Sequence, residues 1–501
     1  VQNSSQPVTL IATNGVIIAT DPSANGYGFT FGANSRFISS GSPVSSNRFI
    51  VTHNVQENVP GVSWWTYVDT AMFRGGSLGA TPKATIQFTD FSFINGPYYY
   101  FPPESGGGFG DLTVKDSTLR GGIFHFVSDS SFQVIAITNC ALERVAFKYR
   151  PYAPATLYVR NNLFKKGSVT IEQAPPSPYT CEWFDNLFDG TVISQLGGAE
   201  TANGYNAYLQ NQTRLTPAPA VQSDQFLTAS PSYEAGPFGK YYLQGSPATL
   251  INKGSRSAAQ AGLFHYTTSK TPGSKEGNKP QQPAPKVDLG VHYLAANSAN
   301  QPLDTDADGL LDYFEDRNGD GFYQLSDLSN FESTDSDGDA LNDFYEYTIA
   351  FNPSLADTGA TGTSDGYKDS DGDGLTNYEE FRLGTNPLIP NVAAPAFNPT
   401  GKSYLSAQTV AVTCPTAGAI VRYTINGTDP TENDLVVPGG GIAVSGNLTL
   451  KAKAWKAGWT SSDIESQGYQ IGNPLPSNLA PTVTVSPASG GTFPASDTIE
   501  I

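Results

Sequence analysis

Charged side chains are scarce in this 501-residue chain: they make up 15% of it, a low share for a cytosolic enzyme. Long apolar runs are absent as well, since no stretch approaches the roughly 18 residues that a membrane-spanning helix needs. Basic residues are fewer than acidic ones, 28 against 46, so the net charge is −18. Nucleic acids and anionic membranes bind basic patches, and neither is therefore expected as the main partner.

Cysteine and histidine are also rare, with three and four residues, respectively. Cys140 and Cys181 fall in different columns of the repeat described below, so a disulfide between them is not expected. Cys414 lies in another expected domain, and the prediction is three buried free thiols. His265 and His292 each stand between an apolar residue and a tyrosine and are expected to be structural. The chain has no Ser-His-Asp order, HExxH pattern or phosphate-binding loop that would favour an enzyme.

The length predicts roughly three or four domains. With 25 tyrosines and 28 phenylalanines, and 38% hydrophobic residues in all, the chain is expected to fold and not to be disordered. It begins at Val1 without a methionine or a signal peptide, which indicates a processed chain or a piece of a longer one.

The net charge is concentrated in one segment. Residues 301–390 contain 21 acidic and 3 basic residues, a balance of −18, which equals the net charge of the whole chain. Such a segment repels itself unless it is disordered or neutralised by bound cations. The spacing of the acidic residues favours bound cations over disorder, because carboxylates recur at alternate positions. A solvated acidic linker is the alternative.

Four 12-residue patterns in this segment match a calcium-binding loop, which supplies oxygen ligands from positions 1, 3, 5, 7, 9 and 12. The expected ligands are Asp304, Asp306, Asp308, Leu310, Asp312 and Glu315; Asp316, Asn318, Asp320, Phe322 and Asp327; Asp335, Asp337, Asp339, Leu341, Asp343 and Glu346; and Asp369, Asp371, Asp373, Leu375, Asn377 and Glu380. Ala340 replaces the usual glycine of the third pattern, and the second lacks a glutamate at position 12. We expect three or four calcium ions.

Two of the patterns run into short helical sequences, LNDFYEYTIAF and LTNYEEFRLG, and each is followed by Asn-Pro, which stops a helix. Glu315 ends one pattern and Asp316 begins the next, so these are not separate EF-hands with full flanking helices. The acidic segment resembles the thrombospondin type-3 and dockerin-like calcium repeats of secreted proteins. The resemblance implies calcium binding and an extracellular location.

A second repeat occupies much of the first 300 residues. The segments FTDFSF, VKDSTL, ITNCAL, VRNNLF and WFDNLF begin at residues 88, 114, 137, 159 and 183, a spacing of 22 to 26 residues. One turn of a right-handed parallel β-helix per repeat explains this period, with clear turns from about residue 84. The third position of each repeat holds Asp90, Asp116, Asn139, Asn161 and Asp185. Because Asp and Asn tolerate left-handed backbone, these residues are expected to form a ladder of turns.

The end of this region carries a further resemblance. The sequences YYLQGSPATLINKG, AGLFHYTT and VDLGVHYLA, followed by Asp-rich repeats, resemble the ends of parallel β-helix regions in large secreted bacterial proteins. Many β-helix proteins are polysaccharide lyases or hydrolases, which need a cluster or a close pair of carboxylates. The outward columns of the expected strands hold no such cluster: they are Gln87, Thr113, Ala136, Tyr158 and Glu182, and Thr89, Lys115, Thr138, Arg160 and Phe184. We therefore predict no catalytic residue.

The C-terminal part is expected to form an antiparallel Ig-like β-sandwich at residues 391–472, because short alternating strands are separated by Gly, Pro and Asn turns. VRYTINGTDPT, LTLKAKAWKAG and SDIESQGYQI resemble the chitobiase/hexosaminidase C-terminal domain, which implies a non-catalytic accessory module. Tyr423, Trp455 and Trp459 could stack on sugars, but core packing is the preferred prediction. Residues 473–501 are expected to be a linker with the opening strands of a further Ig-like domain, or a strand for another subunit.

The predicted protein is mainly β, with the β-helix in residues 1–300, calcium loops with short helices in 301–390, and the sandwich after them. These features favour an extracellular structural or adhesive protein, secreted or on the cell surface, in a fibre or filament. A secreted polysaccharide lyase or hydrolase and a glycan-binding module are the alternatives. The expected partners are copies of the chain in a head-to-tail assembly, where Thr482–Ile501 or Val8–Ala19 adds a strand to the neighbouring copy. Glycans are a further candidate partner.

Overall fold

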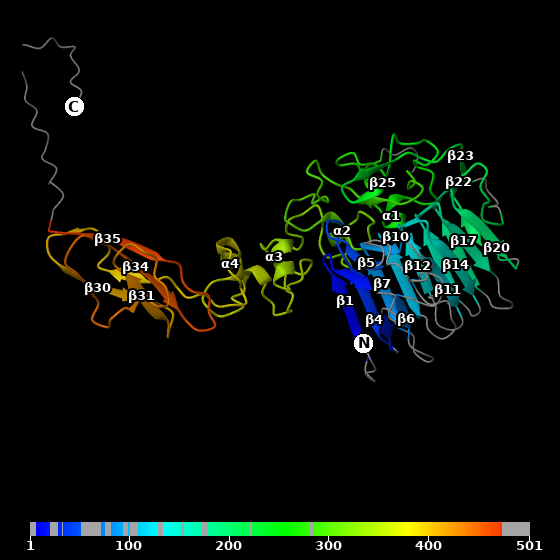
Figure 1. Cartoon of the computed structure of the whole chain (residues 1–501). Coiled ribbons are helices and arrows are strands. Elements are labelled where there is room, and N and C mark those ends of the chain that lie inside the picture. Colours follow the sequence, from blue (N-terminus) through cyan, green and yellow to red (C-terminus); the bar gives the residue numbers. More distant parts are fainter. Residues whose placement is uncertain are drawn as a thin grey trace, which may run out of the picture. The chain divides into compact units, whose positions relative to one another are not determined.

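The computed structural model describes residues 7–20, 29–32, 34–51, 72–75, 82–93, 99–100, 109–128, 134–151, 155–172, 179–197, 199, 201–217, 219, 223–279 and 285–472. The chain divides into two compact units, Val1–Ser336 and Asp337–Ile501. The first contains a β-solenoid, and the second contains antiparallel sheets (Figure 1). None of the helices in the described ranges is long and apolar enough to cross a membrane.

The solenoid consists of parallel sheets whose strands follow one another turn by turn (Figure 1). The first sheet contains β1 (Thr9–Thr13), β4 (Arg36–Ser40), β7 (Lys83–Gln87), β9 (Asp111–Lys115), β12 (Val134–Thr138), β15 (Ala155–Arg160), β18 (Tyr179–Phe184) and β21 (Ala202–Gly204). The second contains β2 (Ile17–Thr20), β5 (Asn47–Val51), β8 (Thr89–Phe93), β10 (Thr118–Gly121), β13 (Ala141–Glu143), β16 (Leu163–Lys165), β19 (Leu187–Asp189), β22 (Ala207–Leu209) and β23 (Gln225–Leu227). The third contains β11 (Ile123–Ser128), β14 (Ala146–Pro151), β17 (Ser168–Glu172) and β20 (Val192–Leu196), and a parallel pair is formed by β3 (Phe29–Phe31) and β6 (Phe73–Gly75). The predicted β-helix is confirmed.

Alternating apolar residues point one face of each strand into the solenoid. In β15, for example, Leu157 and Val159 are fully buried, whereas the residues that alternate with them along the strand are half-buried. Equivalent positions of successive turns then stack on one another. The ring centroids of Phe164 and Phe188 are 5.2 Å apart, and those of Phe188 and Tyr208 are 5.0 Å apart. A continuous column of apolar side chains therefore fills the interior.

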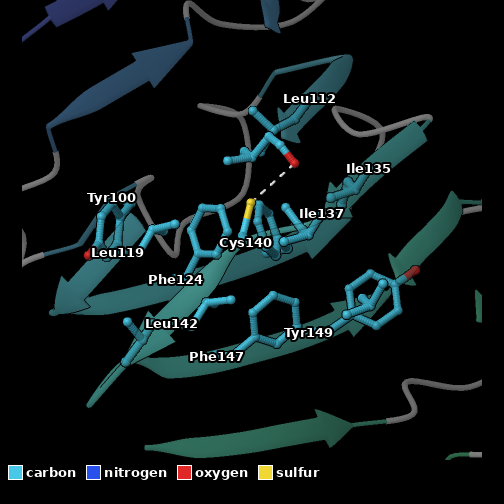
Figure 2. Packing of buried hydrophobic residues seen from close by; sticks show 14 of the residues in the cluster. Tyr100, Leu112, Leu119, Phe124, Ile135, Ile137, Cys140, Leu142, Phe147 and Tyr149 are labelled. Atoms are coloured by element: carbon cyan, nitrogen blue, oxygen red, sulfur yellow. Dashed lines mark hydrogen bonds between the residues drawn. The ribbon is translucent and has the colours of Figure 1, made fainter. Parts of the chain in front are cut away.

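The cysteines belong to this packing and form no disulfide. Figure 2 shows the sulfur of Cys140 among buried leucine, isoleucine and phenylalanine side chains, where its thiol lies 3.5 Å from the carbonyl oxygen of Val114. Cys181 is also buried, and burial raises the pKa of its thiol to about 12. All three thiols are free, as predicted, although Cys414 is only half-buried.

The turn ladder has the predicted backbone but a different first member. The four predicted turn residues from Asp116 to Asp185 all have φ between 50° and 64°. In the preceding turn this place belongs to Phe88, whose φ is 46°. Asp90 instead lies in β8, where it pairs with Thr118 of the next turn. The prediction for Asp90 is therefore wrong.

The outward columns are shifted in the same way at their first member. Thr85 pairs with Thr113, and Gln87 pairs with Lys115, so each column begins two residues earlier than expected. From β9 onward the columns are those predicted.

A second ladder, one residue after the turns, lies inside the solenoid. Asn162, Asn186 and Asn206 are fully buried. The amide oxygen of Asn186 accepts hydrogen bonds from the backbone N–H and the side-chain Nδ2 of Asn162, both at 3.0 Å. Asn206 accepts the same pair from Asn186 at 3.0 and 3.1 Å. These amides satisfy backbone groups that the turning chain would otherwise leave unpaired.

Short elements after the solenoid cover its turns. They are β24 (Tyr233–Gly236), β25 (Gly239–Leu243), α1 (Ala258–Ala261), β26 (Tyr266–Thr267), the 3-10 helix η2 (Glu276–Asn278) and β27 (Tyr293–Leu294). The turn residues hold this cover in place. Asp185 accepts hydrogen bonds from the backbone N–H and the hydroxyl of Ser255, at 2.6 and 2.8 Å. Asn139 exchanges two hydrogen bonds with the backbone of His292.

The second unit contains the predicted antiparallel Ig-like region. One sheet is formed by β28 (Ala396–Asn398), β30 (Gln408–Thr413) and β33 (Ile442–Val444), and the other by β29 (Ser403–Tyr404), β35 (Glu465–Ile471), β34 (Leu448–Trp455), β31 (Ile420–Thr424) and β32 (Leu435–Val436). The core between them includes Val410, Val444 and Leu450, which are fully buried. The predicted terminal strand Thr482–Ile501 lies outside the described residues.

The aromatic residues of this region are only partly where we expected them. Tyr423 packs against the core, as predicted. Trp455 is half-buried on the opposite face of β34, because side chains alternate along a strand. The Nζ atom of Lys453 lies 5.6 Å from its ring centroid, and that of Lys456 lies 3.6 Å from the ring centroid of Trp459. Core packing is therefore the wrong prediction for the two tryptophans.

Candidate metal centres

The acidic segment contains four loops with a shared hydrogen-bond pattern: loop 1 (304–315), loop 2 (316–327), loop 3 (335–346) and loop 4 (369–380). In loop 1, the carboxylate of Asp304 accepts hydrogen bonds from the N–H groups of Ala307 and Gly309, at 2.8 and 3.2 Å. Asp316 and Asp369 accept the corresponding two bonds in loops 2 and 4. The carboxylate at position 1 therefore closes the loop on itself.

Left-handed backbone at positions 4 and 6 curves every loop. These eight residues all have positive φ, and six of them are glycine. Ala340 occupies the glycine position of loop 3 with a φ of 81°, where a Cβ atom is disfavoured. Loop 3 keeps the shared backbone despite the substitution.

The carboxylates at positions 1, 3 and 5 converge in loops 1 and 4, where their oxygen atoms lie within 4.8 Å of one another. They belong to Asp304, Asp306 and Asp308, and to Asp369, Asp371 and Asp373. The residue at position 7 donates its N–H to the carboxylate at position 5, at 2.7 Å from Leu310 and 2.8 Å from Leu375. A set of hard oxygen atoms at this spacing fits calcium.

The three glutamates at position 12, Glu315, Glu346 and Glu380, are fully buried. Each has a carboxylate oxygen without a hydrogen-bond partner among the described residues. Burial first, and then the neighbouring aspartates, raise the pKa of Glu315 to about 8, that of Glu346 to about 10 and that of Glu380 to about 7. A buried carboxylate of this kind needs either a proton or a cation beside it.

Position 9 begins a helix in three loops. These helices are α2 (Asp312–Glu315), α3 (Asp343–Thr348) and α4 (Asn377–Leu383). The side chain at position 9 also bonds to the backbone of position 2: Asp312 accepts from the N–H of Thr305 at 2.7 Å, and Asn377 accepts from that of Ser370 at 3.2 Å. The helix carries the residue at position 12 back toward the aspartates at positions 3 and 5, whose charges raise its pKa.

Loop 2 has a different end. Asp327 at position 12 is buried, and its Oδ2 atom accepts the N–H of Gln324 at 2.9 Å. Its Oδ1 atom has no hydrogen-bond partner in the described part of the chain, and burial raises its pKa. Gln324, at position 9, is absent from the predicted ligands; its side chain donates to Asp320 at 2.6 Å. The N–H of Asp320 in turn donates to Asn318 at 2.8 Å.

Loop 3 crosses the boundary between the two units, and its Asp335 belongs to the first. In the second unit, Asp337 accepts the N–H of Asp339 at 3.2 Å. One oxygen atom each of Asp339, Glu346 and Asp365 lies within 4.8 Å of the other two, and all three residues are buried. The 12-residue spacing could not reveal Asp365, because it comes from a later part of the chain.

Loops 1 and 2 are attached to the solenoid cover through His265, which is buried, as expected of a structural residue. Its Nε2 atom lies 2.9 Å from Asp316, and its Nδ1 atom lies 3.5 Å from Asp312. Burial lowers the pKa of His265, but the hydrogen bonds to the two carboxylates outweigh this effect and raise it. The N–H of Phe264 also donates to the carbonyl oxygen of Gly319 at 3.0 Å.

Two known families match parts of the chain. Residues 369–390 match the bacterial TSP3 repeat. They contain all of loop 4, and TSP3 repeats bind calcium. Residues 399–466 match the chitobiase/beta-hexosaminidase C-terminal domain. No curated protein and no solved structure matches the chain. The two resemblances predicted from the sequence are confirmed.

Proposed function

We propose that loops 1 to 4 bind one calcium ion each. The ligands are the side chains at positions 1, 3, 5 and 12 and the carbonyl oxygen at position 7, with position 9 acting directly or through water. Support comes from the converging aspartates and, above all, from the three buried glutamates at position 12, each with a carboxylate oxygen that has no hydrogen-bond partner among the described residues. Asp365 is proposed as a further ligand in loop 3.

Elemental analysis of protein dialysed against dilute calcium tests this proposal. The expected result is four calcium ions per chain. Removing the carboxylates of loop 4 with Asp371→Asn and Asp373→Asn should reduce the count by one, while Asp463→Asn, in the Ig-like region, should leave it unchanged. A wild-type chain without bound calcium would contradict the proposal.

We further propose that the protein is an extracellular structural or adhesive component, stabilised by calcium. Calcium concentrations outside cells keep such loops loaded, and the module types that match the chain suit that location. The solenoid supplies a stiff body, because the strands of successive turns pair with one another in parallel sheets. These properties suit a fibre subunit, in which load passes through backbone hydrogen bonds.

Head-to-tail association of copies is the proposed assembly. β1 and β2 are the terminal strands of their sheets among the described residues, so each has one edge without a neighbouring strand. Edges of this kind accept a strand from another chain. The candidate donor to these edges is Thr482–Ile501; alternatively, the segment Val8–Ala19, which contributes to β1 and β2, adds its free edges to the last strands, β21 and β23, of a neighbouring copy. Electron microscopy of wild-type protein and of a variant lacking residues 476–501 tests this: filaments that persist in the variant exclude the C-terminal donor.

The Ig-like region favours a second candidate function, glycan contact. Trp455 and Trp459 are half-buried and do not belong to the core cluster of this region, which makes them candidates for stacking on sugars. A glycan array with wild-type protein and with Trp455→Ala tests this. Binding that the substitution abolishes supports the function, whereas Phe397→Leu, a core substitution, should leave it unchanged.

A further inference from the structure

Residues 357–368 lie directly before loop 4 and have the same length. Loop 2 follows loop 1 in the same way, without an intervening residue. Aligned with the four loops, this segment has Asp357 at position 1, Gly362 at position 6, Asp365 at position 9 and Lys368 at position 12. Positions 3 and 5 carry no carboxylate, which is why the alternating acidic pattern does not reveal it.

The backbone of this segment nevertheless repeats that of the calcium loops. Positions 4 and 6, Ala360 and Gly362, have φ values of 49° and 88°. The carboxylate of Asp357 accepts the N–H of Gly362 at 2.6 Å, the bond that links positions 1 and 6 in loops 1, 2 and 4. Asp365 accepts the N–H of Thr358 at 2.9 Å, as position 9 does from position 2 in loops 1 and 4.

Two further features complete the match. The N–H at position 9 donates to the carbonyl oxygen of the residue before the loop, at 2.7 Å from Asp365 to Ala356; the corresponding distances are 3.0 Å in loop 1 and 2.7 Å in loop 4. The 3-10 helix η3 (Asp365–Tyr367) begins at position 9, where helices begin in loops 1, 3 and 4. An unrelated surface turn would not share all these features.

Residues 357–368 differ from the four calcium loops in the side chain at position 12. Instead of a buried carboxylate, Lys368 places its Nζ atom 2.6 Å from Asp357 and 2.6 Å from Asp365, the residues at positions 1 and 9. A Cβ atom built at Gly359, position 3, would lie 3.8 Å from the same Nζ atom. Positions 1, 3 and 9 therefore all face the ammonium group, as they would face an ion in a calcium loop.

The electrostatics of the segment agree with this arrangement. The hydrogen bond from Lys368 lowers the pKa of Asp357. Partial burial lowers the pKa of Lys368, but the two carboxylates outweigh it and raise that pKa. The glutamates at position 12 of loops 1, 3 and 4 have raised pKa values instead, because they lie among other carboxylates. An ordinary surface ion pair would explain the short distances, but not the position of the lysine in the repeat.

We propose that residues 357–368 are a fifth copy of the calcium loop, in which the ammonium group of Lys368 takes the place of the ion. The chain thus supplies its own permanent cation at this point, and the loop stays closed when calcium is removed. The inference rests on the proposed calcium binding of loops 1 to 4. The chain would then have five loops of this type, four with a bound calcium ion and one with the ammonium group of Lys368.

Restoring the missing ligands tests the proposal directly. The double substitution Gly359→Asp and Lys368→Glu supplies carboxylates at positions 3 and 12. Gly359 does not have a positive φ, and a Cβ atom there would lie 3.3 Å from Cγ2 of Thr361, a contact that a small shift of this exposed side chain relieves. Elemental analysis should find one more calcium ion per chain than in wild-type protein. A matched control, Gly446→Asp with Lys402→Glu, changes the net charge equally, places its new aspartate at an open glycine, and should add none. If wild-type protein binds calcium and the folded double variant gains no ion, the inference is wrong; if wild-type protein binds none, the proposed function fails first.

Hydrogen exchange in chelator gives a test that needs no new site. In wild-type protein without calcium, amides of residues 357–368 should stay protected while those of 304–315 lose protection. Lys368→Met keeps the length of the side chain but removes its charge, and it should abolish the protection of 357–368 in chelator. Equal protection in the wild type and in Lys368→Met would overturn the inference.

Discussion

At the scale of single residues, the proposed ion sites depend on buried acids that ordinary packing does not favour. Most of the proposed ligands follow from the sequence, because one 12-residue segment supplies those of a loop and calcium constrains their spacing. Asp365 and Lys368 do not. Asp365 approaches loop 3 from a different segment, and Lys368 replaces the acid by which such a loop is recognised. Asp365 and Lys368 are linked to the repeat by the charges of the side chains around them, and not by the alternating acidic pattern.

Glu346 provides a test with opposite outcomes in two conditions. In calcium, Glu346→Gln removes a ligand and one ion should be lost, so the free energy of unfolding should fall, by up to about 4 kcal/mol at calcium concentrations about 1,000 times the dissociation constant. In chelator, the same substitution removes a buried charge among other carboxylates, and stability should rise. Thermal unfolding in both conditions measures this, with the exposed Glu432→Gln as the control. A change of the same sign in both conditions would contradict the assignment.

The pH dependence of calcium-free protein follows from the same acids. Glu315 and Glu380 have pKa values of about 8 and about 7 in the folded protein, above their ordinary value of 4.5. The folded state therefore keeps protons that the unfolded chain releases, and this stabilisation is lost as the pH rises through the folded pKa values. The slope is about 1.4 kcal/mol per pH unit for each group. Urea unfolding in chelator should show stability falling between about pH 5 and pH 8, and a rise over this range would be incompatible with these buried acids.

At the scale of elements, the sequence predicts the turns of the solenoid correctly but predicts the register of the first repeat wrongly. The shift at the first repeat, with Phe88 in the turn and Asp90 in the strand, amounts to two residues. Side chains alternate with a period of two, so this shift leaves every residue on the same face of the sheet. The apolar pattern cannot detect such an error, whereas a shift of one residue would expose the core. The core prediction for Trp455 is wrong at the same scale, because alternation along β34 places its side chain on the face opposite to Leu450, Ala452 and Ala454.

The asparagine ladder is the element whose loss should matter most. Asn186→Ala removes the side-chain hydrogen bonds to Asn162 and Asn206 and leaves buried backbone groups unpaired. The free energy of unfolding should fall by about 2–6 kcal/mol, from two unsatisfied backbone groups, the N–H of Asn162 and the carbonyl of Val159, at about 1–3 kcal/mol each. Chemical denaturation measures this, and the exposed Asn211→Ala is the matched control. Equal stability of the two variants would show that the ladder is not a stabilising element.

At the scale of the whole molecule, the acidic segment does not form one body of its own. Loops 1 and 2 belong to the solenoid unit, where His265 and the backbone of Phe264 hold them, and loop 4 belongs to the unit with the Ig-like sheets. The amino-acid composition sets the acidic segment apart, because its net charge differs from that of the sequence on either side. Which loop belongs to which unit depends on contacts such as that of His265, which sequence spacing does not reveal.

We propose that bound calcium, and not packing alone, stabilises the folded acidic segment. Differential scanning calorimetry of the full chain in calcium, in magnesium and in chelator tests it most directly. At calcium concentrations about 1,000 times the dissociation constant, each site should stabilise the folded state by about 4 kcal/mol. The account predicts that chelator lowers the melting temperature and that calcium, unlike magnesium, restores it. Identical melting profiles in calcium and in chelator would contradict the account.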